Sequence, residues 1–180
     1  MIPEIDPEIG ILLYATKSAG WGGIIRKENK DFFVSEIISK KIHFDTSSDS
    51  GYTVYKLKKN GIDTTHALSD IFQRHGIRLK SLGLKDASAV TEQFVFTTTK
   101  RKQHFEINES KYSLKKIGIV DKQLSKKEMI GNHFKIKIDG ASNELYKFED
   151  YDKILNFYGY QRFGKQRIQC PSSHSHRRNR

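Results

Sequence analysis

Hydrophobic and polar residues alternate most regularly over residues 133–139, HFKIKID. Phe134, Ile136 and Ile138 fall on one side of an extended chain, and the residues between them are polar. A period of two residues is typical of a strand with one buried face. The pattern therefore predicts a half-buried antiparallel strand over 133–139.

Further strands are predicted where β-branched and aromatic residues gather. These runs are 24–26, 31–37, 52–58, 93–96 and 117–120, and the short apolar run 82–84 is predicted as a further strand. Residues 52–58 carry apolar side chains on both faces, which indicates a central strand of the sheet. Residues 97–109 are polar and basic, and we predict a loop there.

Two segments have the apolar spacing of a helix. Asp63 or Thr64 is suited to cap the start of the first, and Gly76 is suited to its end. The apolar stripe between these caps consists of Ala67, Leu68, Ile71 and Phe72. Residues 148–158 have the same spacing of three or four and predict a second helix. Together the segments predict an α+β fold: a mostly antiparallel sheet with two or three helices packed on it.

The composition favours a folded protein with a polyanionic partner. The chain has 180 residues, of which 36% are hydrophobic and 29% charged, enough for one domain with a sizeable core. It carries 32 Lys and Arg against 21 Asp and Glu, a formal net charge of +11. Nucleic acid is the first candidate partner and an anionic membrane the second. Charge that serves only solubility is the alternative.

Several classes of site are not expected. Cys170 is the single cysteine, so no intrachain disulfide forms, and no Cys/His spacing fits a zinc finger. The run Ile9 to Tyr14 is too short for a secretory core, and no run approaches the ~20 apolar residues of a membrane span. We expect a cytoplasmic protein that binds no membrane and no metal.

Asp86 stands out because it lies between two predicted strands, in the stretch SLGLKDASAVTEQFVF from Ser81 to Phe96. A carboxylate at the tip of a strand is held by rigid elements and faces outward, a common position for catalytic residues. Aspartate is also favoured in turns for backbone reasons. The local pattern leaves both interpretations open.

The same stretch resembles a known family. Gly83-Leu84-Lys85-Asp86, followed by Ala89-Val90-Thr91-Glu92-Gln93, is similar to the central motif of the TruD family of tRNA pseudouridine synthases. Other stretches resemble motifs of that family in the same order: 23–32, 57–64, Gly131-Asn132-His133-Phe134, and 156–164, which reads NFYGYQRFG. The resemblance covers about Gly22 to Gly164.

The resemblance implies roles for individual residues. Asp86 would be the catalytic residue, and Arg26 would face it, at a position where relatives carry Lys. Arg keeps the positive charge but replaces a point donor with a planar fork. Phe134 would lie against the target base, and Asn132 would hydrogen-bond the ribose or the loop that carries Asp86. From the residues alone, a surface cation, a core Phe and a turn Asn remain the alternatives.

Residues outside this centre would hold the RNA or brace the site. Gln161 would support the active-site loop, or it closes a helix end. The basic residues expected to contact RNA phosphates are Lys85, Lys100, Arg101, Lys102 and Arg162. A solvated charged surface is the alternative for this set.

The resemblance also sets the expected domain and function. Residues 1–164 would be part of a pseudouridine-synthase-type catalytic domain, its N-terminal half, and 165–180 a basic, disordered tail with five basic and no acidic residues. Family members continue further, so the chain is expected to be a fragment, a frameshifted copy or half of a two-chain enzyme. A second chain or the missing C-terminal half would complete the sheet. The expected function is isomerisation of a uridine in tRNA to pseudouridine without a cofactor; the alternative is an inactive, truncated RNA-binding remnant.

Overall fold

The computed structural model describes residues 22–48, 50–100 and 105–141, which belong to one compact unit, 22–141. The predicted boundary between 164 and 165 lies outside the described residues. The elements in chain order are β1 (Ile24–Ile25), the 3-10 helix η1 (Asn29–Asp31), β2 (Phe32–Ile38), β3 (Tyr52–Asn60), α2 (Thr64–His75), β4 (Leu79–Ser81), β5 (Val90–Thr97), β6 (Ile107–Asn108), β7 (Tyr112–Val120), the 3-10 helix η2 (Lys126–Glu128), β8 (Met129–Ile136) and β9 (Ile138–Asp139).

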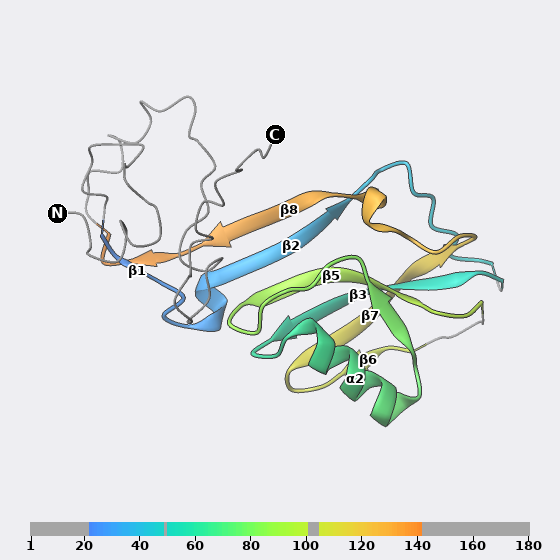
Figure 1. The fold of residues 1–180 in the computed structure, drawn as a ribbon, viewed down its shortest axis with the longest axis horizontal. Coiled ribbons are helices and arrows are strands. Elements are labelled where there is room, and N and C mark those ends of the chain that lie inside the picture. Colours follow the sequence, from blue (N-terminus) through green and yellow to red (C-terminus); the bar gives the residue numbers. More distant parts are fainter. Residues whose placement is uncertain (1–21, 49, 101–104, 142–180) are drawn as a thin grey trace, which may run out of the picture. The chain divides into compact units, whose positions relative to one another are not determined.

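Seven strands form one sheet in the order β6-β7-β3-β5-β2-β8, with β4 paired beside β5 (Figure 1). The pairings are antiparallel except that β2 runs parallel to β5. Strands β1 and β9 form a separate two-stranded sheet. The predicted α+β fold with a mostly antiparallel sheet is confirmed, and so is the central position of β3, between β7 and β5.

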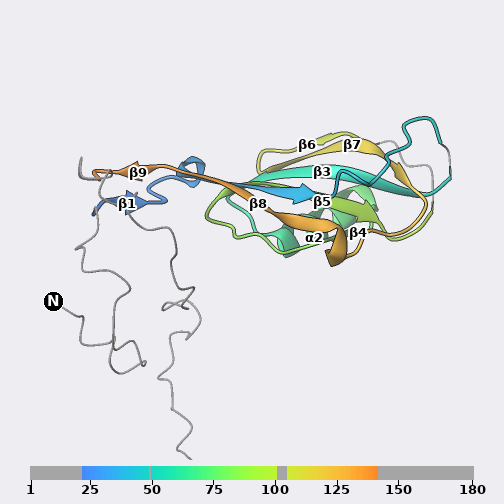
Figure 2. The ribbon, with the colours of Figure 1, turned by 90° about the horizontal axis from the view of Figure 1, so that it is seen from above.

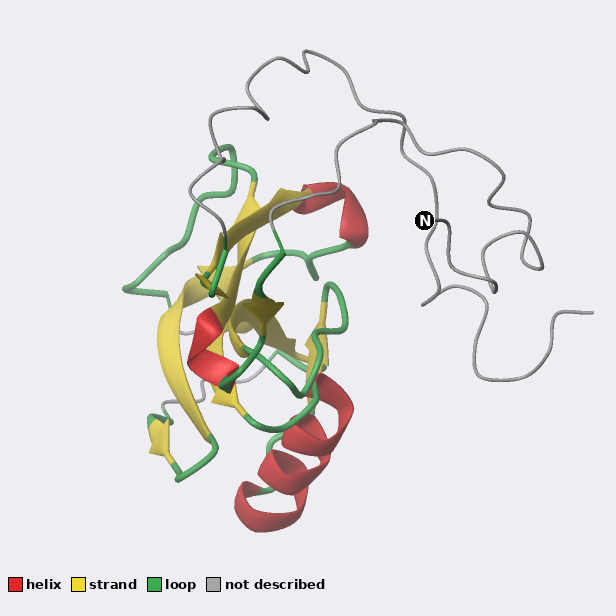
Figure 3. Cartoon of the chain, turned by 90° about the vertical axis from the view of Figure 1, so that its left-hand side faces the viewer, coloured by secondary structure: helices red, strands yellow, loops and turns green. Residues whose placement is uncertain are grey.

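Helix α2 covers one face of this sheet (Figures 2 and 3). The Asp63 side chain accepts a hydrogen bond from the His66 backbone N–H at 3.0 Å and caps the helix start. Gly76 ends the helix with φ +69°, a left-handed conformation that favours glycine. Ala67 and Ile71 are buried against side chains of β3, β5 and β7.

One residue of the predicted apolar stripe behaves differently. Phe72 is exposed, and the Arg78 guanidinium lies over its ring at 4.8 Å from the centroid. Among the described residues α2 is the one α-helix. The other predicted helix, 148–158, lies outside them.

Several strand bounds differ from the prediction, and β5 begins at Val90 rather than at 93. Strand β7 begins at Tyr112 rather than at 117, because Tyr112 and Leu114 reach the core on alternate positions despite the lysines that follow. The short β6 lies in the predicted loop. The strand predicted at 82–84 is absent: β4 ends at Ser81, and Leu84 is exposed.

The antiparallel strand predicted over 133–139 is divided between β8 and β9. Strand β8 pairs antiparallel with β2, but its apolar face is not buried. Phe134 is 54% exposed and Ile136 is 45% exposed. β8 has β2 as its neighbour on one side and forms an edge of the seven-stranded sheet. The prediction of a half-buried strand is wrong here because no element within the described ranges covers this face.

A row of cross-strand neighbours locates the exposed end of this face. Phe134 on β8 pairs with Val34 on β2, Val34 pairs with Thr91 on β5, and Thr91 pairs with Lys59 on β3. Paired residues share a face of a sheet, and residues two apart on a strand do as well. Leu57, two residues before Lys59, packs in the core beneath α2. The row therefore lies on the α2 side; Thr91 and Val34 in it are buried, and the face is open at its β8 end, where Phe134 is exposed.

Candidate active site

Asp86 lies in the loop of residues 82–89 that connects β4 to β5. The Gln93 side-chain amide donates to the Gly83 carbonyl at 3.1 Å, and the Lys85 backbone N–H donates to the Thr64 hydroxyl at 2.9 Å. Thr64 begins α2, so the helix start and β5 both hold the loop. Asp86 therefore lies on a tethered loop rather than at the tip of a strand.

Arg26 and Asp86 form an ion pair, with 3.3 Å between the guanidinium Nη2 and the carboxylate Oδ2. The Arg26 side chain is 33% exposed and that of Asp86 57%, so water reaches both groups. Arg26 has φ +59°, which is uncommon for a residue other than glycine. The guanidinium carbon lies 3.9 Å from the Phe32 ring centroid, a cation–π contact that fixes its direction.

These groups surround a hollow of about 230 Å³ on the open part of the sheet face. Its lining residues come from the loop, from β2, β5 and β8, and from the segment after β1. They are Arg26, Phe32, Val34, Leu84, Lys85, Asp86, Ala89, Thr91, Asn132 and Phe134. The structure thus brings together four residues that the sequence singled out for the centre: Asp86, Arg26, Asn132 and Phe134.

Two aromatic rings form one wall of this hollow. Phe134 meets Phe32 edge to face, with ring centroids 6.2 Å apart and planes at 73°. Such a pair holds the Phe134 ring in place although half of that residue is exposed. An exposed, oriented aromatic ring beside a carboxylate is suited to stack on a planar ligand.

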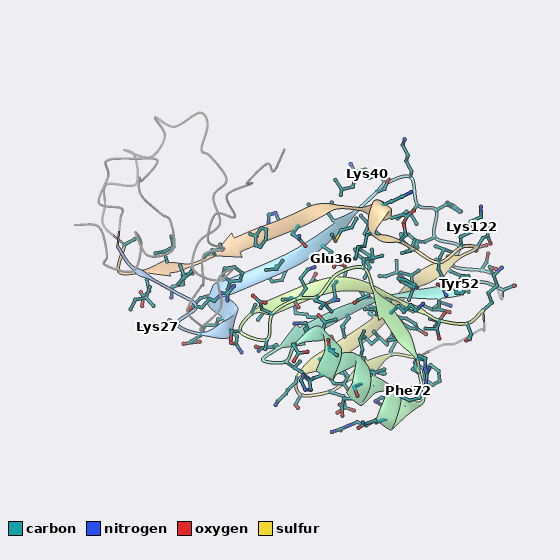
Figure 4. The ribbon with its side chains drawn as sticks, viewed as in Figure 1. Lys27, Glu36, Lys40, Tyr52, Phe72 and Lys122 are labelled. Carbon is teal, nitrogen blue, oxygen red and sulfur yellow. The ribbon has the colours of Figure 1, made fainter. Side chains whose placement is uncertain are left out.

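Lys85 has a different environment from the one predicted. Its ammonium lies 2.7 Å from the Glu36 carboxylate, and the two side chains are 9% and 0% exposed. Glu36, labelled on β2 in Figure 4, also accepts the Phe94 backbone N–H at 2.9 Å. The prediction that Lys85 contacts RNA phosphates does not fit this burial, because a phosphate would have to displace Glu36.

Lys59 is a residue at the site that the sequence analysis missed. It is 1% exposed, and its ammonium donates to the carbonyls of Ile62, Lys85 and Asp86 at 2.8, 3.1 and 2.7 Å. Burial lowers the pKa of Lys59 from 10.5 to about 8, although the nearby Asp63 and Asp86 carboxylates act in the opposite direction. The sequence does carry a signal for this burial, because Lys59 falls on the same face of β3 as the buried Tyr55 and Leu57.

The other predicted site residues do not reach this hollow or cannot be placed. Lys100 lies with its ammonium 5.7 Å from the Tyr52 ring centroid, away from the residues that line the hollow. Gln161, Arg162, Arg101 and Lys102 lie outside the described residues.

A larger hollow of about 440 Å³ lies between α2 and the β6–β7 connection, and Asp70, Arg74 and Glu109 in its lining form ion pairs with one another. The Tyr112 hydroxyl donates to Asp70 at 2.7 Å, and Arg74 contacts both Asp70 and Glu109. The Tyr112 hydrogen bond lowers the pKa of Asp70, while burial raises that of Tyr112. We place the candidate active site at Asp86, because the hollow there brings this carboxylate together with Arg26, Asn132 and Phe134.

The described residues contain neither a membrane-spanning helix nor a cluster of metal-binding side chains. No helix among them is long and apolar enough to cross a membrane. They also contain no group of three or more His, Cys, Asp or Glu side chains that could hold a metal ion.

Comparison with known proteins gives consistent matches. The family model for tRNA pseudouridine synthase D (TruD) matches residues 8–174. A relative from Methanosarcina mazei named probable tRNA pseudouridine synthase D is 33% identical over 92% of this chain and 40% of its own. A relative of the same name from Archaeoglobus fulgidus is 27% identical over 91% of this chain and 41% of its own.

A solved structure matches as well. The crystal structure of a TruD protein from Methanosarcina mazei is 28% identical, with a TM-score of 0.75, over 91% of this chain and 40% of that one. This chain therefore spans about two fifths of the length of the relatives that it matches. Because the family model covers most of the sequence, the chain belongs to the tRNA pseudouridine synthase D (TruD) family.

Proposed function

We propose that this chain is the part of a tRNA pseudouridine synthase that carries the catalytic carboxylate, and that it isomerises a uridine in tRNA. The observation that carries the proposal is the Arg26–Asp86 ion pair at 3.3 Å, in the same hollow as Asn132 and Phe134. A cation, a carboxylate, an amide and an aromatic ring are the groups that a nucleoside reaction of this kind needs. We expect it in the cytoplasm, as the substrate implies.

The reaction needs a carboxylate at the sugar and no cofactor. The bond from C1′ to N1 breaks, the uracil turns, and a bond forms from C1′ to C5. The proton on C5 leaves to solvent and N1 gains one, so the base keeps its composition. Asp86 either attacks C1′ or removes the C2′ proton, and both routes need its ionised form. The Arg26 guanidinium, 3.3 Å from the carboxylate, would hold it in one direction beside the ribose.

Phe134 and Asn132 would hold the target nucleotide. A uridine inside a helical stem has to leave its stack to reach Asp86, and stacking on an aromatic ring offsets roughly 1–3 kcal/mol of that cost. Phe134 is exposed and lines the same hollow as Asp86. Asn132, next on the same side of β8, is placed to hydrogen-bond the ribose or the Asp86 loop. The hollow, about 230 Å³, is below the ~300 Å³ at which ligand pockets usually begin, and it suits one nucleoside.

The wider RNA contact rests on charge. The formal charge of +11 favours tRNA binding through phosphates, with Lys100, Arg101, Lys102 and Arg162 as the proposed contacts. Gln161 is proposed to support the loop. The remaining part of the relatives' length is proposed to come from further sequence or a second chain, which would cover the exposed face of β8.

Tritium release from C5-labelled uridine in tRNA tests the proposal. The 180-residue chain is compared with Asp86→Asn, which keeps the shape of the side chain and removes its charge. We expect release by the unchanged chain and loss of at least about a thousandfold in the variant, because the carboxylate takes part in bond breaking. Binding of tRNA without release would support the alternative, an RNA-binding remnant. If the chain neither binds tRNA nor releases tritium, both the proposed function and the alternative are wrong.

A further inference from the structure

We infer that Lys59 is the residue that positions Asp86, by binding the two backbone carbonyls on either side of it; this inference rests on the proposed function. The Lys59 ammonium donates to the Lys85 carbonyl at 3.1 Å and to the Asp86 carbonyl at 2.7 Å. These two peptide groups flank the Asp86 Cα. Fixing both restricts the φ and ψ angles of Asp86, and these angles set the direction of its side chain.

The third hydrogen bond of the Lys59 ammonium connects the Asp86 loop to the rigid part of the fold. Lys59 donates to the Ile62 carbonyl at 2.8 Å, in the turn between β3 and α2. Lys59 itself lies on β3, which is hydrogen-bonded on both sides by β5 and β7. The Asp86 loop is thus attached through one side chain to a strand in the middle of the sheet.

The three carbonyl groups around the Lys59 ammonium require a cation at this position rather than an apolar side chain. Three carbonyl oxygens point at one position, so their negative ends repel one another unless a donor group lies between them. An ammonium has three donors and no acceptor, which matches this set in number and charge. Burying it costs free energy that an apolar side chain would not cost. What lysine supplies in return is the attachment of the loop.

The surrounding charges fit this role. Asp63 in the turn and Asp86 in the loop attract the ammonium, while Lys85 repels it. On the flanking strands its register partners are the uncharged Thr91 and the Tyr112 phenol. Burial dominates, and it lowers the pKa of Lys59 to about 8. The hydrogen bonds to the loop are therefore expected to weaken just above neutral pH.

The test compares Lys59→Met with Lys58→Met, the adjacent lysine, whose side chain is 57% exposed and lies 3.5 Å from Glu92. Amide hydrogen exchange of residues 83–89 is measured first, because it reports loop order without any turnover. We expect exchange there to rise at least about tenfold in Lys59→Met and to stay unchanged in Lys58→Met. Unchanged loop exchange in a folded Lys59→Met would overturn the inference.

Turnover and binding of tRNA are measured next on the same proteins. We expect the rate of isomerisation to fall about a hundredfold in Lys59→Met, because small displacements of a reacting group are costly, while the Kd for tRNA changes less than about threefold. An equal loss in both variants would contradict a specific role for Lys59. If the unchanged chain has no activity, the proposed function fails, and the exchange measurement still decides whether Lys59 holds the loop.

A second measurement covers the case in which Lys59→Met does not fold. The carbon-13 resonance of the Lys59 Cε and the amide resonances of Asp86 and Ala87 are followed in the unchanged chain from pH 6 to 10. Loop amides that shift with the same midpoint as the Cε support the inference. Loop amides that do not follow the Lys59 titration overturn it.

Discussion

The guanidinium of Arg26 contacts the carboxylate of Asp86 at 3.3 Å, although 60 positions of sequence separate the two residues. Both side chains are accessible to water, and an accessible ion pair contributes only about 0–1 kcal/mol to stability. The same guanidinium lies on the Phe32 ring. The pair therefore adds little to the stability of the fold, and we propose that its role is to orient the Asp86 carboxylate.

Two substitutions of Arg26 separate the effect of its positive charge from the effect of its planar shape. We expect Arg26→Met to lower the rate of isomerisation at least about tenfold, because the variant loses the guanidinium that contacts the Asp86 carboxylate and orients it. Arg26→Lys should retain more activity than Arg26→Met, since it keeps the charge and loses only the planar contact with Phe32. Turnover with tRNA and thermal unfolding of both variants check this. Equal activity in the two variants would show that the charge of Arg26 has no role.

Phe134 should matter for activity and hardly at all for folding. We expect Phe134→Ala to weaken productive tRNA binding by roughly 1–3 kcal/mol, the contribution of one stacked base. Its unfolding free energy should change little, because the residue is 54% exposed. The control is Ile130→Ala, on the same strand and 67% exposed, which does not line the hollow. Phe134→Trp should preserve binding, and a folded Phe134→Ala with unchanged kinetics would exclude the stacking role.

Local patterns predicted most of the elements because alternation and capping are properties of neighbouring residues. Asp63, Gly76 and the buried Ala67 and Ile71 place α2 within a residue of its observed ends. The order of the strands, with β2 parallel to β5, depends on contacts across the chain that no local pattern encodes. The grouping of Asp86, Arg26, Asn132 and Phe134 was therefore expected only from the resemblance to the TruD family.

Two lysines show where sequence analysis fails. A lysine is assigned to the surface by default, and the Glu36 that neutralises Lys85 lies 49 positions away. That partner is invisible to local reasoning. Lys59 differs, because its phase with Tyr55 and Leu57 on β3 already points it inward. A charged residue on the buried side of a central strand is thus a readable signal.

The Glu36–Lys85 pair should be important for stability. Its side chains are almost completely buried, so Lys85→Met leaves the Glu36 carboxylate without its partner cation. We expect a loss of about 3–5 kcal/mol in unfolding free energy, the usual result of breaking a buried pair from one side. Urea unfolding of Lys85→Met, Glu36→Gln and the double variant measures it. The double variant should be more stable than the sum of the single losses implies, and simple additivity would mean that the two groups are not coupled.

The pH dependence of stability tests the buried charge of Lys59 directly. Its pKa is about 8 in the folded chain and 10.5 for the ordinary group, the value expected after unfolding. Below pH 8 both states hold the proton, and the folded state bears the cost of the buried charge. Between the two values the unfolded chain binds more protons, so the unfolding free energy rises with pH, by roughly 3 kcal/mol at most.

Other groups titrate in this window, so the measured quantity is the difference in slope between the unchanged chain and Lys59→Met. We expect Lys59→Met to lack this part of the rise and Lys58→Met to keep it. Identical slopes in the unchanged chain and Lys59→Met would mean that Lys59 keeps its ordinary pKa in the fold. The Asp86 loop should become less ordered as the pH rises over the same range. The neutral Lys59 amine lacks the positive charge and has one hydrogen-bond donor fewer than the ammonium.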